Sequence, residues 1–300
     1  MRPTLLDKAL PAKDLFAIRL GRIGFINTVP VYHGLQQALP KNLQSQIHVV
    51  SNTPMGLNKA IVAGHLELSP VSTAWYAQHQ DQLTLLPGLS VSSLGSVESV
   101  LLVSDFGLHQ WQGQPIAVPD DSATSVAVLR ALIQHHSGID PLDAFVVYPA
   151  HLQEQALRDY PAVLTIGDRA LAWLHGQNTA ALTPGLTTKQ PIDLATAWQA
   201  FTGEPLVFAV WVARSEWLKT HETEAIQVMD ALIKSKNEFL SSEPSQHEAC
   251  KTLVSATALS ESILKHYWTQ SLDYGWSEGH QASVERLSAL MTHTRVSCLV

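Results

Sequence analysis

The stretch "LVFAVWVAR", Leu206–Arg214, is a long β-rich run, and the chain changes character there. Strand and helix patterns alternate before it, whereas the chain after it carries almost only helical patterns. A second apolar stretch, "ESVLLVS" at Glu98–Ser104, also has the composition of a strand. The two strands enclose about a hundred residues. We therefore predict that the chain leaves one domain through the first strand and returns to it through the second.

An inserted domain of this kind is typical of a hinged two-lobed binding protein, whose ligand lies in the cleft between the lobes. The predicted boundaries are a tail at 1–17, a discontinuous first lobe at 18–103 and 207–300, and an inserted second lobe at 104–206. Short apolar strands alternate with helical stretches through both lobes up to the second crossing strand. This alternation predicts an α/β fold with mostly parallel sheets covered by helices.

The composition argues against several classes of function. The net charge is −7 and no basic run occurs, which argues against a nucleic-acid partner. No apolar run is long enough to span a bilayer, and the first residues lack the unbroken apolar core of a secretory signal. Cys250 and Cys298 form no motif and are typical of reduced thiols. We expect a cytoplasmic protein with a small-molecule partner and no membrane contact, and the oligomeric state is left open.

The stretch "VPDDSATSVAVLRALIQHH", 118–136, passes from the end of a strand into a helix whose apolar residues recur at helical spacing. Ser122 is placed to cap a helix that begins at Ala123. A cap needs only one hydroxyl, yet Thr124 and Ser125 also lie in the first turn. The alternative is an anion site, in which these hydroxyls and the free N–H groups of the helix start bind a ligand.

Three other turns repeat this pattern of a polar side chain at the end of a strand. Asn27 lies in "GFINTVPVYHG", Ser72 in "LSPVST" and Ser99 in "SVSSLGSVES". Each residue alone fits a helix cap or an ordinary turn, but their convergence on strand ends indicates the wall of a cleft. Asp168, at the end of a further strand, either caps the next helix or orients a ligand hydroxyl.

Motifs for metals and cofactors are missing from the sequence. The histidines form no HExxH motif, and no Cys/His spacing is typical of zinc. The sequence has no phosphate-binding loop, no dinucleotide-binding glycine motif and no G-x-S-x-G. None of these signals for metal or cofactor chemistry is therefore present.

Six stretches, in chain order, are shared with a known family. They are "RIGFINTVPVYHGL", "GHLELSPVSTAWYA", "LLPGLSVSSLGSVESVLLVS", "IAVPDDSATSVAVLRALI", "LTIGDRAL" and "DLATAWQAFTGEPLVFAVWVAR". In these motifs the chain resembles the chorismate dehydratases of the futalosine route to menaquinone. The match runs from about residue 22 to 214, and the helical remainder matches only loosely.

The resemblance implies a type II periplasmic-binding-protein fold, with two α/β lobes joined by two crossover strands and reused as a cytosolic enzyme. It implies a hydro-lyase that converts chorismate to 3-(1-carboxyvinyloxy)benzoate and water without metal or cofactor. The cleft asparagine of the family corresponds to Asn27 and its cleft serine to Ser99. The S-A-T-S turn of the family is intact at 122–125.

These correspondences suggest a role for each turn. We expect Ser122, Thr124 and Ser125 to hold one carboxylate of chorismate together with the neighbouring N–H groups. Asn27 would orient the C4 hydroxyl or the other carboxylate, because an amide both donates and accepts. Ser99 would contact the reacting edge of the ring, and Ser72 and Asp168 would complete the substrate-binding set.

Apart from Asp168, the scheme gives no acidic or basic side chain a role. Asp120 and Asp121 would repel a substrate carboxylate, so we expect both to point away from the cleft. The four turns contain no histidine or glutamate, apart from Glu98 and His33 nearby. The candidate proton acceptor is therefore the enolpyruvyl carboxylate of the substrate itself.

Two other functions fit the same fold. One is a non-catalytic protein that binds a small anion, since a fold alone does not decide function. The other is the related dihydroxynaphthoate synthase, although the motifs fit the dehydratase better.

Overall fold

The computed structural model describes residues 18–176 and 189–293, so the tail predicted at 1–17 lies outside the described residues. The described chain forms two mixed sheets of five strands each, covered by helices. The predicted α/β fold with two lobes is confirmed. No helix among the described residues has the length and apolar character needed to cross a membrane.

The first sheet has the strand order β2-β1-β3-β10-β4. Its strands are β1 (Ile18–Ile23), β2 (Ile47–Asn52), β3 (Leu68–Ser72), β4 (Leu83–Ser93) and β10 (Leu206–Arg214). β1 is parallel to β2 and β3, whereas β10 is antiparallel to both of its neighbours. The stretch Leu206–Arg214 is therefore an interior strand, which explains why its Trp211 is fully buried.

The second sheet has the equivalent order, β7-β6-β8-β5-β9. Its strands are β5 (Val100–Ser104), β6 (Ile116–Pro119), β7 (Phe145–Tyr148), β8 (Ala162–Ile166) and β9 (Gln190–Asp193). β6 is parallel to β7 and β8, whereas β5 is antiparallel to β8 and β9. Each sheet thus contains one antiparallel strand next to a parallel core.

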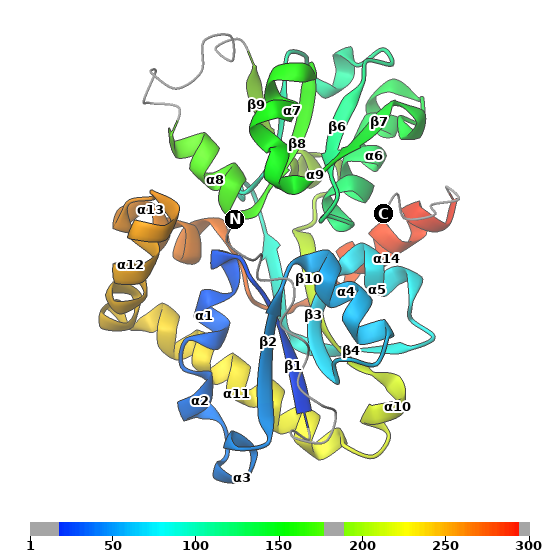
Figure 1. Cartoon of the computed structure of the whole chain (residues 1–300). Helices are drawn as coiled ribbons and strands as arrows, with labels where there is room; N and C mark the ends of the chain where they lie inside the picture. The colour runs from blue at the N-terminus through cyan, green and yellow to red at the C-terminus, as the bar shows by residue number, and fades with distance from the viewer. Residues whose placement is uncertain (1–17, 177–188, 294–300) are drawn as a thin grey trace, which may run out of the picture.

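Helices connect and cover these strands. They are α1 (Val29–Tyr32), α2 (Leu35–Ala38), α3 (Lys41–Gln44), α4 (Pro54–Val62), α5 (Thr73–Gln78), α6 (Thr124–Ser137), α7 (Gln153–Asp159), α8 (Gly167–Gly176), α9 (Leu194–Thr202), α10 (Ser215–Leu218), α11 (Glu222–Ser241), α12 (Glu243–Thr257), α13 (Glu261–His266) and α14 (Glu278–His293). Shorter turns are the 3-10 helices η2 (Ile26–Thr28), η3 (Leu108–Gln110), η4 (Leu142–Ala144) and η5 (Ala150–Leu152), and the π-helical turn η6 (Tyr267–Ser271). Figure 1 shows the second sheet with α6 to α9 above the first, and α12 and α13 beside the junction.

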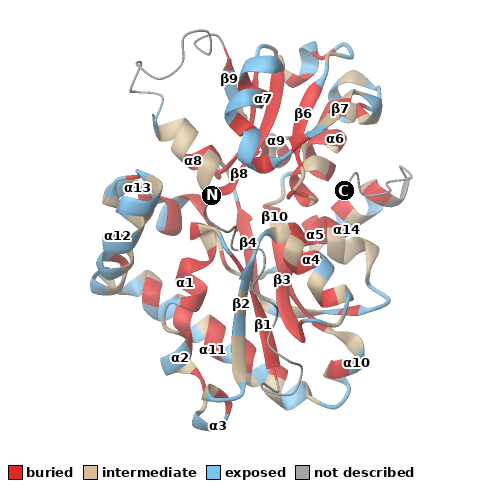
Figure 2. Cartoon of the chain, viewed as in Figure 1, coloured by how far each residue is buried: buried red, intermediate tan, exposed pale blue. Residues whose placement is uncertain are grey.

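Local sequence signals account for the element boundaries. The Thr53 hydroxyl caps α4 by accepting from the Gly56 N–H, with Pro54 at the first helical position. Gly138 ends α6 with a φ of 73°, a left-handed conformation that glycine adopts readily. Interior strands such as β3 and β6 are buried throughout, whereas the edge strand β2 is largely accessible (Figure 2). The apolar and mixed strand sequences therefore match their places in the sheets.

The chain crosses between the lobes just before each strand that was predicted as a crossing. β4 belongs to the first sheet and β5 to the second, and the return leads from β9 through α9 to β10. β5 pairs with β8 along its length, so residues 100–103 belong to the second sheet. We propose lobe boundaries at 94–99 and 194–205, in place of those expected after residues 103 and 206.

One carboxylate joins the two crossings. Oδ2 of Asp193 accepts from the Ser96 hydroxyl at 2.9 Å and from the N–H groups of Val97 and Glu98 at 2.9 and 2.8 Å. Oδ1 of the same residue caps α9, by accepting from N–H groups of its first turn at 3.0 and 3.1 Å. The outgoing and returning chains are therefore fixed to each other at the junction of the lobes.

The substitution Asp193→Ala should lower the free energy of unfolding by roughly 2–4 kcal/mol, since it removes a helix cap and several charge-assisted hydrogen bonds. Chemical denaturation of the two proteins measures the difference. Ser96→Ala is the matched control, because it removes only one of these bonds and should cost less than about 1 kcal/mol. Equal stability of D193A and the parent would contradict a joining role for this carboxylate.

Candidate functional site

A cavity lies between the two lobes, with a volume of about 550 Å³ that includes open solvent at its mouth. Its polar lining consists of Asn27, Ser72, Ser99, Asp121, Ser122, Thr124 and Ser125. Phe25 and Phe208 of the first lobe and Ile166 of the second are among its apolar walls. Its position between two lobes, with a few polar groups among apolar walls, is typical of a site for a small molecule.

Six of the seven residues predicted from the sequence line this cavity, which are Asn27, Ser72, Ser99, Ser122, Thr124 and Ser125. They come together because each lies at or close to the end of a strand, on the side where the two sheets face each other. The seventh, Asp168, is not among the lining residues, although the adjacent Gly167 is. Their roles toward a ligand stay predictions.

Asn27 offers an acceptor that the protein does not use. It lies in η2 directly after β1, and its backbone carbonyl accepts from the Tyr274 hydroxyl at 2.8 Å. Its side-chain Oδ1 is buried and has no hydrogen-bond partner. A buried amide oxygen without a partner costs about 1–3 kcal/mol, so this atom calls for a donor from a ligand.

Ser99 is oriented by a tyrosine that sequence reasoning did not find. The Tyr267 hydroxyl donates to Oγ of Ser99 at 2.7 Å, and the Gly167 N–H donates to the Ser99 carbonyl at 2.7 Å. Burial raises the pKa of Tyr267 far above its ordinary value, so the phenol keeps its proton and remains the donor. The hydrogen of the Ser99 hydroxyl is then left to donate toward the cavity.

Ser72 is held in a similar way by Asn58. The Asn58 side chain donates to Oγ of Ser72 at 3.0 Å and accepts from the Ser72 N–H at 3.0 Å. Both side chains are buried. The Ser72 hydroxyl is thus fixed as an acceptor from the protein, and its own hydrogen is available to a ligand.

The turn before α6 corrects the predicted cap. The helix begins at Thr124, and Ala123, the residue before it, already has helical angles, with no side-chain cap. The prediction that Ser122 caps a helix from Ala123 is wrong, because the backbone enters the helix without that bond. Neither Ser122 nor Ser125 makes a side-chain hydrogen bond to the described residues, although both are buried.

Thr124 has a structural task between the lobes. Its hydroxyl donates to the Phe208 carbonyl of β10 at 2.8 Å and accepts from the Ala74 N–H of α5 at 3.2 Å. Ser122 and Ser125 are therefore the hydroxyls of the turn that remain for a ligand.

The two aspartates of this turn differ. Oδ1 of Asp120 accepts from the Ala150 N–H at 3.0 Å, which agrees with the expectation that Asp120 points away. Asp121 lines the cavity, so the expectation for Asp121 is wrong. The physical reason is a partner in the second lobe: Oδ2 of Asp121 accepts from Nη2 of Arg169 at 3.2 Å.

Asp168 joins the lobes instead of capping its own helix. Its Oδ1 accepts from the Ile26 N–H in η2 at 2.9 Å, whereas α8 begins one residue earlier, at Gly167. A Cβ at Gly167 would lie 2.9 Å from the Phe25 ring, which shows how closely the two lobes approach there. Burial raises the pKa of Asp168 to about 6, although the bond from Ile26 and the charge of Arg169 lower it.

Other ionisable groups lie outside the cavity. Glu98 contacts His175 at 2.8 Å and His266 at 3.3 Å, and His33 lies 3.9 Å from Glu248. None of these residues, nor any other histidine, glutamate, lysine or arginine of the described chain, lines the cavity. In the same described ranges, no three His, Cys, Asp or Glu residues gather as metal ligands would.

Comparison with known proteins places this geometry in a family. A family model described as menaquinone biosynthesis matches residues 18–293. The chain belongs to this menaquinone biosynthesis family. A chorismate dehydratase of Thermus thermophilus is 35% identical over 208 residues, which cover 66% of this chain and 70% of that protein. The resemblance seen in the sequence motifs is thereby confirmed.

Solved structures confirm the periplasmic-binding-protein-like fold. A protein of Archaeoglobus fulgidus is similar with a TM-score of 0.70 and 16% identity, covering 93% of this chain and 97% of that one. The alkanesulfonate-binding protein of Xanthomonas axonopodis pv. citri, bound to MOPS, is similar with a TM-score of 0.66 and 16% identity, covering 93% of each chain. At these identities the likeness shows the fold alone.

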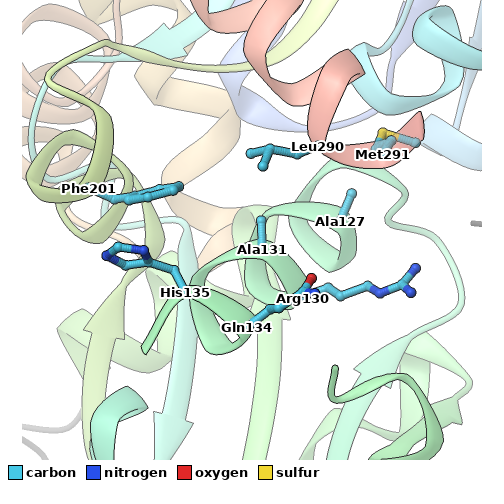
Figure 3. A pocket seen from close by; sticks show the side chains of 8 residues that line it. All are labelled: Ala127, Arg130, Ala131, Gln134, His135, Phe201, Leu290 and Met291. Carbon is cyan, nitrogen blue, oxygen red and sulfur yellow. The ribbon is translucent and has the colours of Figure 1, made fainter. Parts of the chain in front are cut away.

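A second cavity, of about 600 Å³ with open solvent included, lies between α6, α9 and α14 (Figure 3). Its lining consists of Ala127, Arg130, Ala131, Gln134, His135, Phe201, Leu290 and Met291. The His135 ring packs on Phe201 with 4.1 Å between centroids, and the Arg130 guanidinium, at the other end in Figure 3, is paired with Asp140. None of the residues predicted from the sequence lies there, so the cavity between the lobes is the candidate site.

Asp168 predicts a pH dependence of stability. Its pKa in the folded protein, about 6, lies above the ordinary 3.8, so protonation favours the folded state. This contribution is complete below about pH 4 and is lost as the pH rises through about 6. Asp168→Asn keeps an acceptor for the Ile26 N–H but cannot titrate.

The free energy of unfolding of the parent, relative to D168N, should therefore fall between about pH 4 and pH 6. Denaturation of both proteins across this range measures the difference and cancels the other titrating groups. Parallel curves for the two proteins would show that Asp168 does not titrate there.

Proposed function

We propose that this protein is a chorismate dehydratase, a hydro-lyase that forms 3-(1-carboxyvinyloxy)benzoate and water in menaquinone biosynthesis. Membership of the family and the 35% identical chorismate dehydratase of Thermus thermophilus support this proposal. The observation that carries it is the cavity between the lobes, which gathers an unused amide oxygen and several hydroxyls from both lobes.

The chemistry suits such a cavity. Chorismate carries two carboxylates, a C4 hydroxyl and an enolpyruvyl ether at C3. Loss of the C4 hydroxyl and the C3 proton makes the ring aromatic, so the reaction is strongly downhill. The enzyme has to hold the substrate in one geometry and exclude the competing rearrangement of the enolpyruvyl group, a task of positioning and electrostatics.

The start of α6 would bind one carboxylate. The first N–H groups of a helix have no acceptor within the helix and carry the positive end of its dipole. The Ser122 and Ser125 hydroxyls lie beside them without partners among the described residues. Backbone N–H groups and hydroxyls together bind an anion without a lysine or arginine.

Asn27 and Ser99 would bind the reacting part of the substrate. Oδ1 of Asn27 is the acceptor that a C4 hydroxyl can satisfy, and Ser99, held by Tyr267, can donate. No histidine or glutamate of the described chain lines the cavity. The enolpyruvyl carboxylate of the substrate then serves as proton acceptor, positioned by these contacts.

Closure of the lobes would exclude water from the reaction. Thr124 and Asp168 already bond across the lobes, as a closed state requires. Enzymes use such closure to complete the site around the substrate.

The deciding experiment is incubation of the purified protein with chorismate, followed by mass detection. The expected result is a product lighter by one water. Recovery of chorismate unchanged from a bound complex would support the alternative of a small-anion binding protein. Conversion of only the substrate of dihydroxynaphthoate synthase would support that second alternative.

The variants Asn27→Ala and Ser99→Ala should each lower kcat by about 10²–10³-fold, the usual loss for one positioned hydrogen-bonding group. Steady-state kinetics and separate measurement of product binding distinguish turnover from affinity. Ser96→Ala is the matched control, because Ser96 bonds Asp193 and does not line the cavity.

Glu98→Gln and His33→Asn test the substrate as its own base. Both residues lie outside the cavity lining, so both variants should keep kcat within about threefold. A variant of either residue that binds the product normally but does not turn over would assign the proton acceptor to that side chain.

A further inference from the structure

Asp121 is the ionisable side chain in the cavity that the binding scheme leaves without a task. The residue is 7% exposed and lies directly before the Ser122 turn. Oδ2 accepts from Nη2 of Arg169, whereas Oδ1 is buried and has no hydrogen-bond partner. A buried carboxyl oxygen without a hydrogen-bond partner costs folding free energy unless it carries a proton or bonds a ligand.

The surroundings shift Asp121 toward the neutral acid. Burial raises the pKa of Asp121 above its ordinary value, the Arg169 charge opposes this, and the neighbouring Asp120 adds to it. The third ionisable neighbour is Tyr148 of β7, whose own pKa is raised by burial and by the two aspartates. Tyr148 donates to the Leu164 carbonyl and stays uncharged.

The hydrogen bond from Arg169 determines which oxygen carries the proton. Oδ2 already accepts from the guanidinium, so a proton on Asp121 resides on Oδ1. The neutral side chain then presents an O–H donor without an acceptor, in a cavity that holds the acceptor Oδ1 of Asn27. A ligand hydroxyl placed between them would satisfy both, because it donates one hydrogen bond and accepts another.

We propose that Asp121 is the general acid of the elimination and gives its Oδ1 proton to the departing C4 hydroxyl. This inference rests on the proposed function. The proposed mechanism names the substrate as proton acceptor but names no proton donor, and Asp121 fills that role. A hydroxide is a poor leaving group, and its protonation in the transition state accelerates such a step by about 10²–10⁴-fold.

The step balances with the substrate alone. The C3–H bond breaks and its proton passes to the enolpyruvyl carboxylate, while the electron pair forms the C3–C4 double bond. The C4–O bond breaks as Asp121 protonates the oxygen, so water leaves. The proton on the substrate carboxylate returns to Asp121 directly or through that water, which restores the acid without an oxidant, reductant or co-reactant.

A neutral Asp121 also resolves the repulsion that a charged one would create. The Ser122 turn is the proposed carboxylate site, and an ionised neighbour there would oppose substrate binding. The protonated side chain removes this opposition and adds a donor.

The test compares Asp121→Asn with Asp120→Asn, two isosteric changes at adjacent positions. D121N keeps a hydrogen-bond donor but cannot transfer a proton, so kcat should fall by about 10²–10⁴-fold with KM nearly unchanged. D120N, which only loses charge at the Ala150 contact, should keep its maximal kcat. Product binding and thermal unfolding show that each variant is folded.

The pH profile of kcat/KM separates acid catalysis from a structural role. Activity should be lost as the pH rises through the pKa of Asp121, because the acid form is required. Arg169→Gln removes the charge that lowers this pKa and should move the alkaline limb to higher pH, while Arg169→Lys should move it less. D120N removes a charge that raises the pKa of Asp121, so it should move the alkaline limb of the profile to lower pH.

The outcomes are distinct. If the parent converts chorismate but D121N keeps full kcat, or if R169Q and D120N leave the alkaline limb in place, Asp121 is not the acid and the dehydratase proposal stands. If the parent does not convert chorismate, the function itself fails, whatever the variants do.

Discussion

The carboxylate of Asp193 is the contact on which the two-lobed arrangement depends. It accepts from Ser96, Val97 and Glu98 on the outgoing crossing and from the first turn of α9 on the returning one. The two crossings are the only covalent links between the sheets in the described chain, so any lobe motion has to take place around this point. The Asp193 side chain thereby links the two crossings, which together form the hinge between the lobes.

The cavity depends on this link between the two crossings. With the crossings fixed, the edges of the two sheets face each other, and the turns at their strand ends contribute Asn27, Ser99 and Ser122 from three segments of the chain. Thr124 and Asp168 then bond across the gap, which uses side chains of the same turns to hold the lobes together. The residues that line the cavity and the residues that bond across the lobes are therefore neighbours in the same turns. A ligand that binds these turns also affects the contacts that hold the lobes together.

The sequence allowed prediction of the features that depend on local pattern. Alternating elements and the run at Leu206–Arg214 predicted two α/β lobes, and polar residues at strand ends predicted six lining residues of the cavity. Features that depend on partners far apart in the sequence could not be predicted. Tyr267 bonds Ser99 across 168 positions, and Thr124 bonds Phe208 across 84. The orientation of Asp121 depends on Arg169, which no periodicity or spacing connects to it.

The absence of lysine and arginine from the lining of the described cavity is consistent with a substrate that carries its own base. A cation beside the enolpyruvyl carboxylate would lower the pKa of that group and make it a weaker proton acceptor. It would also bind the ground state and the transition state about equally, which improves affinity without raising kcat. Hydroxyls, an amide and helix N–H groups orient the substrate through hydrogen bonds, without the full positive charge of a lysine or arginine. The guanidinium of Arg169 is bonded to Asp121, where its charge lowers the pKa of the proposed acid.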